Sequence, residues 1–239
     1  MQILSLFFIK DTNHRKQLNL KTNIMKRITF SICVLLMALT ACTKDTIEGS
    51  GSPISEFRDV AYFSKVSSEG VFEVTITQGD FQSVEITADD NIIQRVRTKV
   101  VNNELRLYLD DENYKDIRLK ANIVAERING VKNSGIGNVM IANVDESGNF
   151  NVDNSGTGNI SITGVAESLT LINEGDGTFH GFQFAVSDCD IEISGSGDCE
   201  VHATGTLNVN IEGSGDVFYK GTPAIQTKIS GSGRVINAN

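Results

Sequence analysis

The sequence predicts an all-β protein: a parallel β-helix, or solenoid, with a less regular β cap at its N-terminal end. Three observations lead to this prediction. A Gly-x-Gly phrase returns six times at steps of 18–21 residues, and a fixed period of this kind is typical of repeat architectures. The residues between the phrases alternate between apolar and polar, which indicates strands with one buried face. Glycine occurs 22 times and proline twice, so glycine alone marks the turns.

The repeat region covers residues 128–239. The first glycine of each phrase falls at Gly135, Gly156, Gly175, Gly195, Gly213 and Gly231. Each repeat reads as strand, glycine turn, strand and second turn. The second turns are expected near Gly148, Gly164, Gly181, Gly205 and Gly221.

One repeat cannot bury its apolar face alone, but equivalent strands stacked about 4.8 Å apart complete a core. A Greek-key sandwich is the competing architecture, and it leaves the constant register unexplained. Glycine is expected at the turns either because the chain turns there with positive φ or because successive coils approach closely.

Residues 54–127 lack the phrase and are expected to cap the open end of the solenoid, because a stack of repeats needs an atypical terminal unit. Alternation predicts strands at residues 71–77, 83–87 and 105–109. A short helical turn is predicted within residues 89–95.

Residues 25–41 have the pattern of a secretory signal. A basic start at Lys26 and Arg27 is followed by an apolar stretch over residues 28–39, which is too short for a membrane span with ordinary flanks. The ending Leu39-Thr40-Ala41-Cys42 resembles a bacterial lipobox. The sequence therefore predicts that the mature chain begins at a lipidated Cys42, which attaches it to the membrane.

Residues 1–24 precede a signal that is already complete from Met25. We expect them to be an upstream extension of the gene model, with a long basic n-region as the alternative. After the lipidated cysteine, the polar Gly/Ser-rich run at residues 42–53 reads as a flexible tether.

Removal of residues 1–41 takes away six of the 21 basic and one of the 30 acidic residues, so 15 bases and 29 acids remain and the net charge is −14. Such a chain repels phosphate backbones, which makes nucleic acid an unfavourable partner. Anchoring must then come from the acyl chains rather than from charge.

A column of Asx residues follows the glycine phrases at Asn138, Asn159, Asp198 and Asp216. Calcium-binding β-rolls stack aspartates next to glycines, but their repeat is half as long. Turn capping by the Asx side chains is the favoured interpretation, and we expect neither a metal nor a cofactor.

Catalysis is not expected. Enzymes that cleave glycans need paired carboxylates or a metal site on one face. The acids of the repeats fall at outward strand positions, where solvated charge is the ordinary explanation, and the two histidines of the mature chain, His180 and His202, have no metal spacing. The chain has no Trp, which weakens any sugar-stacking platform.

Two cysteines remain in the repeat region. Cys189 and Cys199 fall in apolar columns on the strands that flank one glycine turn. A disulfide could persist after export, and buried free thiols are equally compatible with these positions. Phenylalanines also crowd this part of the chain, at Phe179, Phe182 and Phe184, and some of them are expected to face outward.

The pattern as a whole resembles the bacterial family of putative auto-transporter adhesin, head GIN domain proteins. The resemblance rests on Gln78-Gly79-Asp80 between two strands, on Asp89-Asp90-Asn91-Ile92, and on the Gly-Ser-Gly-Asp repeats, and it spans residues 48–239. It implies an exported β-helical domain, often carried by a lipoprotein, and brings no catalytic or binding residues with it.

The sequence thus favours a lipid-anchored protein of the outer membrane that serves as a surface adhesin or binding scaffold for a glycan or protein ligand. A periplasm-facing structural or envelope-assembly lipoprotein is the alternative, and a β-helical polysaccharide-degrading enzyme is a weaker one. A homo-oligomer formed through the edge of the last coil is a further prediction.

Overall fold

The computed structural model describes residues 45–239, and the strands lie in one unit, Thr46–Asn239. The predicted upstream extension, the signal and Cys42 lie outside the described residues. Within them the fold is all-β, with a single 3-10 turn, η1 (Ile93–Arg95). No helix of the described part is long and apolar enough to cross a membrane.

The strands in chain order are β1 (Thr46–Glu48), β2 (Pro53–Phe57), β3 (Lys65–Ser68), β4 (Phe72–Gln78), β5 (Ser83–Asp89), β6 (Val96–Val101), β7 (Glu104–Leu109), β8 (Asn113–Lys115), β9 (Leu119–Ala125), β10 (Gly130–Asn133), β11 (Val139–Asn154), β12 (Ile160–Asn173), β13 (Phe179–Ile193), β14 (Cys199–Ile211), β15 (Val217–Lys220), β16 (Ala224–Ile229) and β17 (Val235–Asn237).

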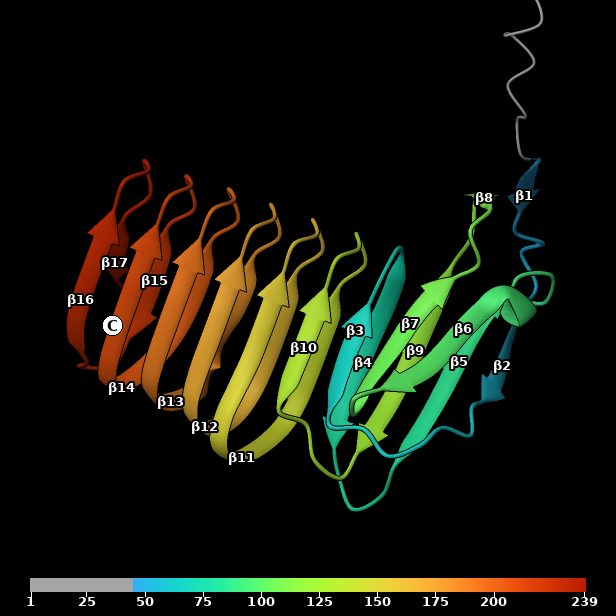
Figure 1. Cartoon of the computed structure of the whole chain (residues 1–239), viewed down its shortest axis with the longest axis horizontal. Coiled ribbons are helices and arrows are strands. Elements are labelled where there is room, and N and C mark those ends of the chain that lie inside the picture. Colours follow the sequence, from blue (N-terminus) through green and yellow to red (C-terminus); the bar gives the residue numbers. More distant parts are fainter. Residues whose placement is uncertain (1–44) are drawn as a thin grey trace, which may run out of the picture. The chain divides into compact units, whose positions relative to one another are not determined.

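Most neighbouring strands pair in parallel, and Figure 1 shows them stacked side by side in a β-helix-like arrangement. Each coil has two sides. The A side stacks β9, β4, the first halves of β11–β14, β15 and β17. The B side stacks β7, β3, β10, the second halves of β11–β14, and β16. This parallel stacking confirms the all-β prediction and is incompatible with a Greek-key sandwich.

The two strands of a repeat are joined more smoothly than the sequence predicts. In β11–β14 the chain passes from the A side to the B side as one continuous bent strand, with register shifts in place of a separate second turn. Positive-φ residues mark two of these bends, Asn143 (φ 61°) and Gly164 (φ 128°). In the last coil Gly221 (φ 94°) lies in a separate turn between β15 and β16, as predicted near that glycine.

The glycine phrases answer the question left open by the sequence. Their glycines do not adopt positive φ. Instead, a Cβ on Gly156 would overlap the carbonyl oxygen of Gly135, and one on Gly175 would overlap that of Gly156. The same overlap recurs along both glycine columns, so these positions are glycine because successive coils approach closely.

A buried polar ladder runs beside these turns. Asn133, Asn154 and Asn173 are fully buried. Asn154 Nδ2 donates to Asn173 Oδ1 (3.3 Å) and to the Gly177 carbonyl (3.3 Å). The ladder satisfies amides inside the core and fixes the glycine turn of the next coil. From Ile193 onward the same column is apolar.

The N-terminal part of the described chain adds antiparallel strands to the stack. β5 pairs antiparallel with β9, β2 with β5, and β6 with β7. The coil made of β3 and β4 is first in sequence but second in space, because β7 and β9 pair on its outer side.

The tether predicted over residues 42–53 is shorter than expected, because β1 pairs with β8 from Thr46 onward. Asn91 then fixes the following turn: its Nδ2 donates to the Glu48 carbonyl (2.8 Å), and its Oδ1 accepts from the Ser50 backbone N–H (3.1 Å). Residues 46–53 therefore belong to the folded unit. The segment has no alternating pattern of apolar residues, so its composition alone predicts a linker.

Candidate groove on the B side

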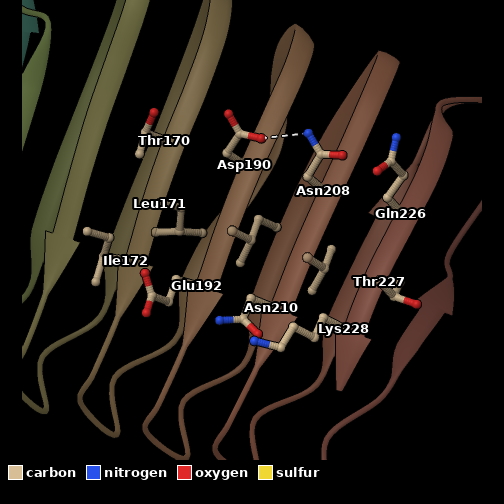
Figure 2. A pocket seen from close by; sticks show the side chains of 12 residues that line it. Thr170, Leu171, Ile172, Asp190, Glu192, Asn208, Asn210, Gln226, Thr227 and Lys228 are labelled. Atoms are coloured by element: carbon tan, nitrogen blue, oxygen red, sulfur yellow. Dashed lines mark hydrogen bonds between the residues drawn. The ribbon is translucent and has the colours of Figure 1, made fainter. Parts of the chain in front are cut away.

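The B side of the later coils carries a shallow groove. Its volume is about 530 Å³, and it runs across β12, β13, β14 and β16. We call this feature the axial groove. Its two walls are rows of outward-facing side chains (Figure 2): Thr170, Asp190, Asn208 and Gln226 in one row, and Ile172, Glu192, Asn210 and Lys228 in the other.

The strand register builds these rows. Thr170 pairs with Asp190, Asp190 with Asn208, and Asn208 with Gln226, so one wall residue comes from each coil. Leu171, Ile191 and Val209 also line the groove, although their side chains are buried. The floor is therefore backbone, whose N–H and C=O groups already pair with the adjacent coils.

A second hollow lies next to the axial groove on the B side, toward the N-terminal cap. Its volume is about 260 Å³, and it shares Thr170 and Ile172 with the axial groove. Lys132 crosses to Asp153 there at 2.6 Å, and this hydrogen bond raises the pKa of Lys132 above its ordinary value. The axial groove and this second hollow together form one polar strip, which extends over the B side from β7 to β16.

Hydrogen bonds between coils hold the wall residues in place. Asn208 Nδ2 donates to Asp190 Oδ1 (2.8 Å), as Figure 2 shows. In the neighbouring outer row, Thr206 Oγ1 donates to Asp188 Oδ1 (2.6 Å). Side chains tied in this way lose less freedom when they bind a ligand.

The Asx column caps coils, but across the stack rather than within its own turn. Asn138 Oδ1 accepts from the Asn159 backbone N–H (2.9 Å), and Asp198 Oδ1 accepts from that of Asp216 (2.8 Å). The hydrogen bond from Arg234 lowers the pKa of Asp216. Among the described residues no group of three His, Cys, Asp or Glu could hold a metal ion.

The two histidines and most acids of the repeats lie at the surface, but Glu146 is buried and paired with Arg127, which corrects the expectation that all these acids face outward. His180 Nδ1 lies 3.0 Å from Glu200 Oε2 on the A side, with both side chains partly exposed, and the B-side acids belong to the rows described above. Their contacts are with neighbouring coils, as expected for a solvated sheet face.

Cys189 and Cys199 are free and buried in the core. Burial raises the pKa of the Cys189 thiol well above its ordinary range and that of Cys199 to about 12. Asn173 Nδ2 also lies 3.7 Å from Cys199 Sγ. The sequence is compatible with either a disulfide or two buried free thiols, and the structure has the buried free thiols.

The phenylalanine cluster is mostly core. Phe179 and Phe184 are buried. Phe182 is half-buried, and its outer face is covered by Lys220, whose Nζ lies 4.5 Å from the ring centroid. This part of the chain therefore offers no open aromatic patch.

Sequence reasoning missed the rows of the groove. Their residues, all polar except Ile172, stand at a constant offset before each glycine phrase. Aligning the repeats on the glycines and reading down the outward columns would have found them.

The fold and the groove define a class: a β-helix-like solenoid that presents a repeated polar face. A family model described as "Putative auto-transporter adhesin, head GIN domain" matches residues 62–223, and the chain belongs to this family. No curated protein matches the chain.

Two solved structures resemble it. One is described as a putative adhesin from Bacteroides fragilis, with a TM-score of 0.66 and 24% identity over 80% of this chain and 99% of that one. The other is described as a putative adhesin from Parabacteroides merdae, with a TM-score of 0.51 and 20% identity over 82% of this chain and 100% of that one. At these identities the likeness concerns the fold.

Proposed function

We propose that this protein is an exported, lipid-anchored binding scaffold that acts as an adhesin at the outer surface of the cell, without catalysis. The main support for the proposal is the polar strip on the B side, to which successive coils each add outward side chains at equivalent positions. A repeated face of this kind is suited to holding an extended ligand, and membership of a putative adhesin family supports the same role.

The anchor is the lipidated Cys42. It stands four residues before β1, so little free chain separates the lipid from the folded unit. An acyl-anchored protein fractionates with membranes. In the variant Cys42→Ser we expect the protein to lose its membrane association while the folded unit stays intact, as measured by fractionation and by mass spectrometry of the N-terminal peptide. Unchanged membrane association in this variant would contradict the proposed anchor.

Adhesion is tested with a deletion strain on surfaces coated with glycans or matrix proteins. We expect deletion to reduce adherence, the wild-type chain to restore it, and the Cys42→Ser chain to fail, because a released domain cannot link cell to surface. Equal adherence of the deletion and parent strains on every coating would overturn the adhesin role.

A further inference from the structure

The axial groove also indicates what kind of ligand the scaffold holds. Resting on the function proposed above, we propose that the groove binds an extended, uncharged polysaccharide that lies along the stacking direction of the coils.

Geometry favours a polymer with a short repeat. Each coil adds one residue to each wall, and the step between coils is the strand spacing of about 4.8 Å. Asp190, Asn208 and Gln226 therefore stand at regular intervals, as do Glu192, Asn210 and Lys228. A chain of similar units meets a hydrogen-bonding side chain from each of these coils at each step, so many weak contacts act together.

The chemistry of the walls favours hydroxyl groups. The amides and Lys228 donate, while Asp190, Glu192 and the amide oxygens accept. A sugar hydroxyl can do both, so it can bridge adjacent wall residues. Pairing of a peptide strand with the floor is excluded, because the floor backbone is already paired with neighbouring coils. The walls expose one partly buried apolar side chain, Ile172, which leaves little to hold apolar side chains of a peptide.

One wall acceptor is unpaired. The Oδ1 atom of Asn210 is covered and has no hydrogen-bond partner in the described chain. A buried acceptor without a donor is unfavourable. Rotation of this amide toward the groove would let a ligand hydroxyl pair with it.

Charge excludes anionic polymers. The groove contains Asp190 and Glu192 against the single cation Lys228, on a chain whose predicted mature charge is −14. Uronate or sulfate groups would face carboxylates at close range, which weakens binding most at low salt. An uncharged chain avoids this cost.

The test is native affinity electrophoresis of the soluble chain that begins after Cys42. This chain contains the whole folded unit, Thr46–Asn239. The gels contain dextran, glucomannan, xyloglucan or mixed-linkage β-glucan as uncharged polymers, and polygalacturonate or dextran sulfate as anionic ones. Each protein is compared with its own mobility in a gel without polymer.

The test variant is the double substitution Asn208→Ala and Asn210→Ala, which removes one amide from each wall on β14. The control is His180→Ala with Glu200→Ala, which removes two polar side chains from the A side. Gln226→Ala on exposed β16 is a second, single test variant, and far-UV circular dichroism verifies that each variant folds.

We expect at least one uncharged polymer to retard the wild type. The double variant should bind at least about 10-fold more weakly, since two hydrogen bonds are lost, while the control binds like the wild type. Three results would overturn the proposal. They are no retardation of the wild type by any uncharged polymer, binding by the double variant that equals that of the wild type, or binding of anionic polymers that is as tight as binding of the uncharged ones. If the domain binds no uncharged polymer but still supports adherence, only the proposed ligand is overturned. Binding here by a domain that does not support adherence overturns only the adhesin role.

Discussion

Gly175→Ala tests whether the glycine columns exist because of close approach between coils. Gly175 does not adopt positive φ, so alanine meets no conformational obstacle of its own. Its Cβ would overlap the carbonyl oxygen of Gly156 in the preceding coil. The two coils must separate locally or the turn must rebuild.

The loss of folding stability caused by Gly175→Ala can be estimated from the backbone hydrogen bonds at this contact. Glu174 N–H donates to the Asn154 carbonyl (2.9 Å), Gly175 N–H donates to the same carbonyl (3.1 Å), and Gly177 N–H donates to the Gly156 carbonyl (3.4 Å). Weakening these three bonds costs roughly 2–4 kcal/mol. The lower backbone entropy of alanine in the unfolded chain offsets about 0.4–1 kcal/mol of this. We expect a net loss of roughly 2–3 kcal/mol.

The control is Gly148→Ala. Gly148 also has no positive φ, and its added Cβ would meet only Glu146 Oε1, at an ordinary 3.4 Å. This variant should be unchanged or up to about 1 kcal/mol more stable. Urea unfolding followed by circular dichroism compares the two midpoints. Equal stability of Gly175→Ala and Gly148→Ala would refute the close-approach explanation.

Three further predictions follow from the buried polar groups. Asn154→Ala leaves the buried Asn173 Oδ1 without its donor and removes the hydrogen bonds that Asn154 makes to Asn133 Nδ2 and to the Gly177 carbonyl, so we expect a loss of about 2–3 kcal/mol in the free energy of unfolding, measured by urea titration. Arg127→Ala removes the partner of Glu146, whose side chain is 2% exposed and accepts from Arg127 Nε and Nη2 at 2.8 Å each. Because this pairing lowers the pKa of Glu146, its stabilisation is present above the unfolded pKa of about 4.3 and is lost as the pH falls through the folded pKa. Arg127→Ala should therefore lower the urea midpoint at pH 7 and lower it less at pH 3. The thiols of Cys189 and Cys199 should resist a thiol reagent in the native state and react on unfolding, and stability should fall as the pH rises from about 9 toward 12, because only the unfolded thiols ionise there.

The first two predictions have matched control variants, and each of the three has an outcome that would contradict it. Asn208→Ala on the exposed wall of the groove should change stability by no more than about 0.5 kcal/mol, and a cost equal to that of Asn154→Ala would contradict the ladder. Arg97→Ala breaks an exposed pair with Asp110 and should lower the urea midpoint less than Arg127→Ala does. A loss for Arg127→Ala that is the same at pH 3 and pH 7 would contradict the role of Glu146. Recovery of no free thiol after unfolding would contradict the thiol assignment.

Much of the fold could be predicted because every coil has the same two sequence signals: apolar and polar residues that alternate along the strands, and glycines at a nearly constant spacing. The alternation around Leu169 and Leu171 fixes which side chains face the core, and the constant step fixes parallel stacking. The second turns were overestimated because Gly148 and Gly205 read as breaks, although the chain bends there within a continuous strand.

The parts that sequence reasoning missed depend on contacts between distant residues. The pairing of β1 with β8 joins residues more than sixty positions apart and has no local signal. The buried ladder of Asn133, Asn154 and Asn173 contradicts the usual exposure of asparagine, and only the neighbouring coils supply its partners. The groove likewise depends on register, since each wall residue comes from a different repeat.

The central claim is that the anchored solenoid faces the outside of the cell. Protease treatment of intact cells, followed by detection of the protein with an antibody against the repeat region, tests it most directly. We expect loss of the domain on intact cells while a periplasmic marker survives. Full protection until the outer membrane is permeabilised would contradict the claim and support the periplasm-facing alternative.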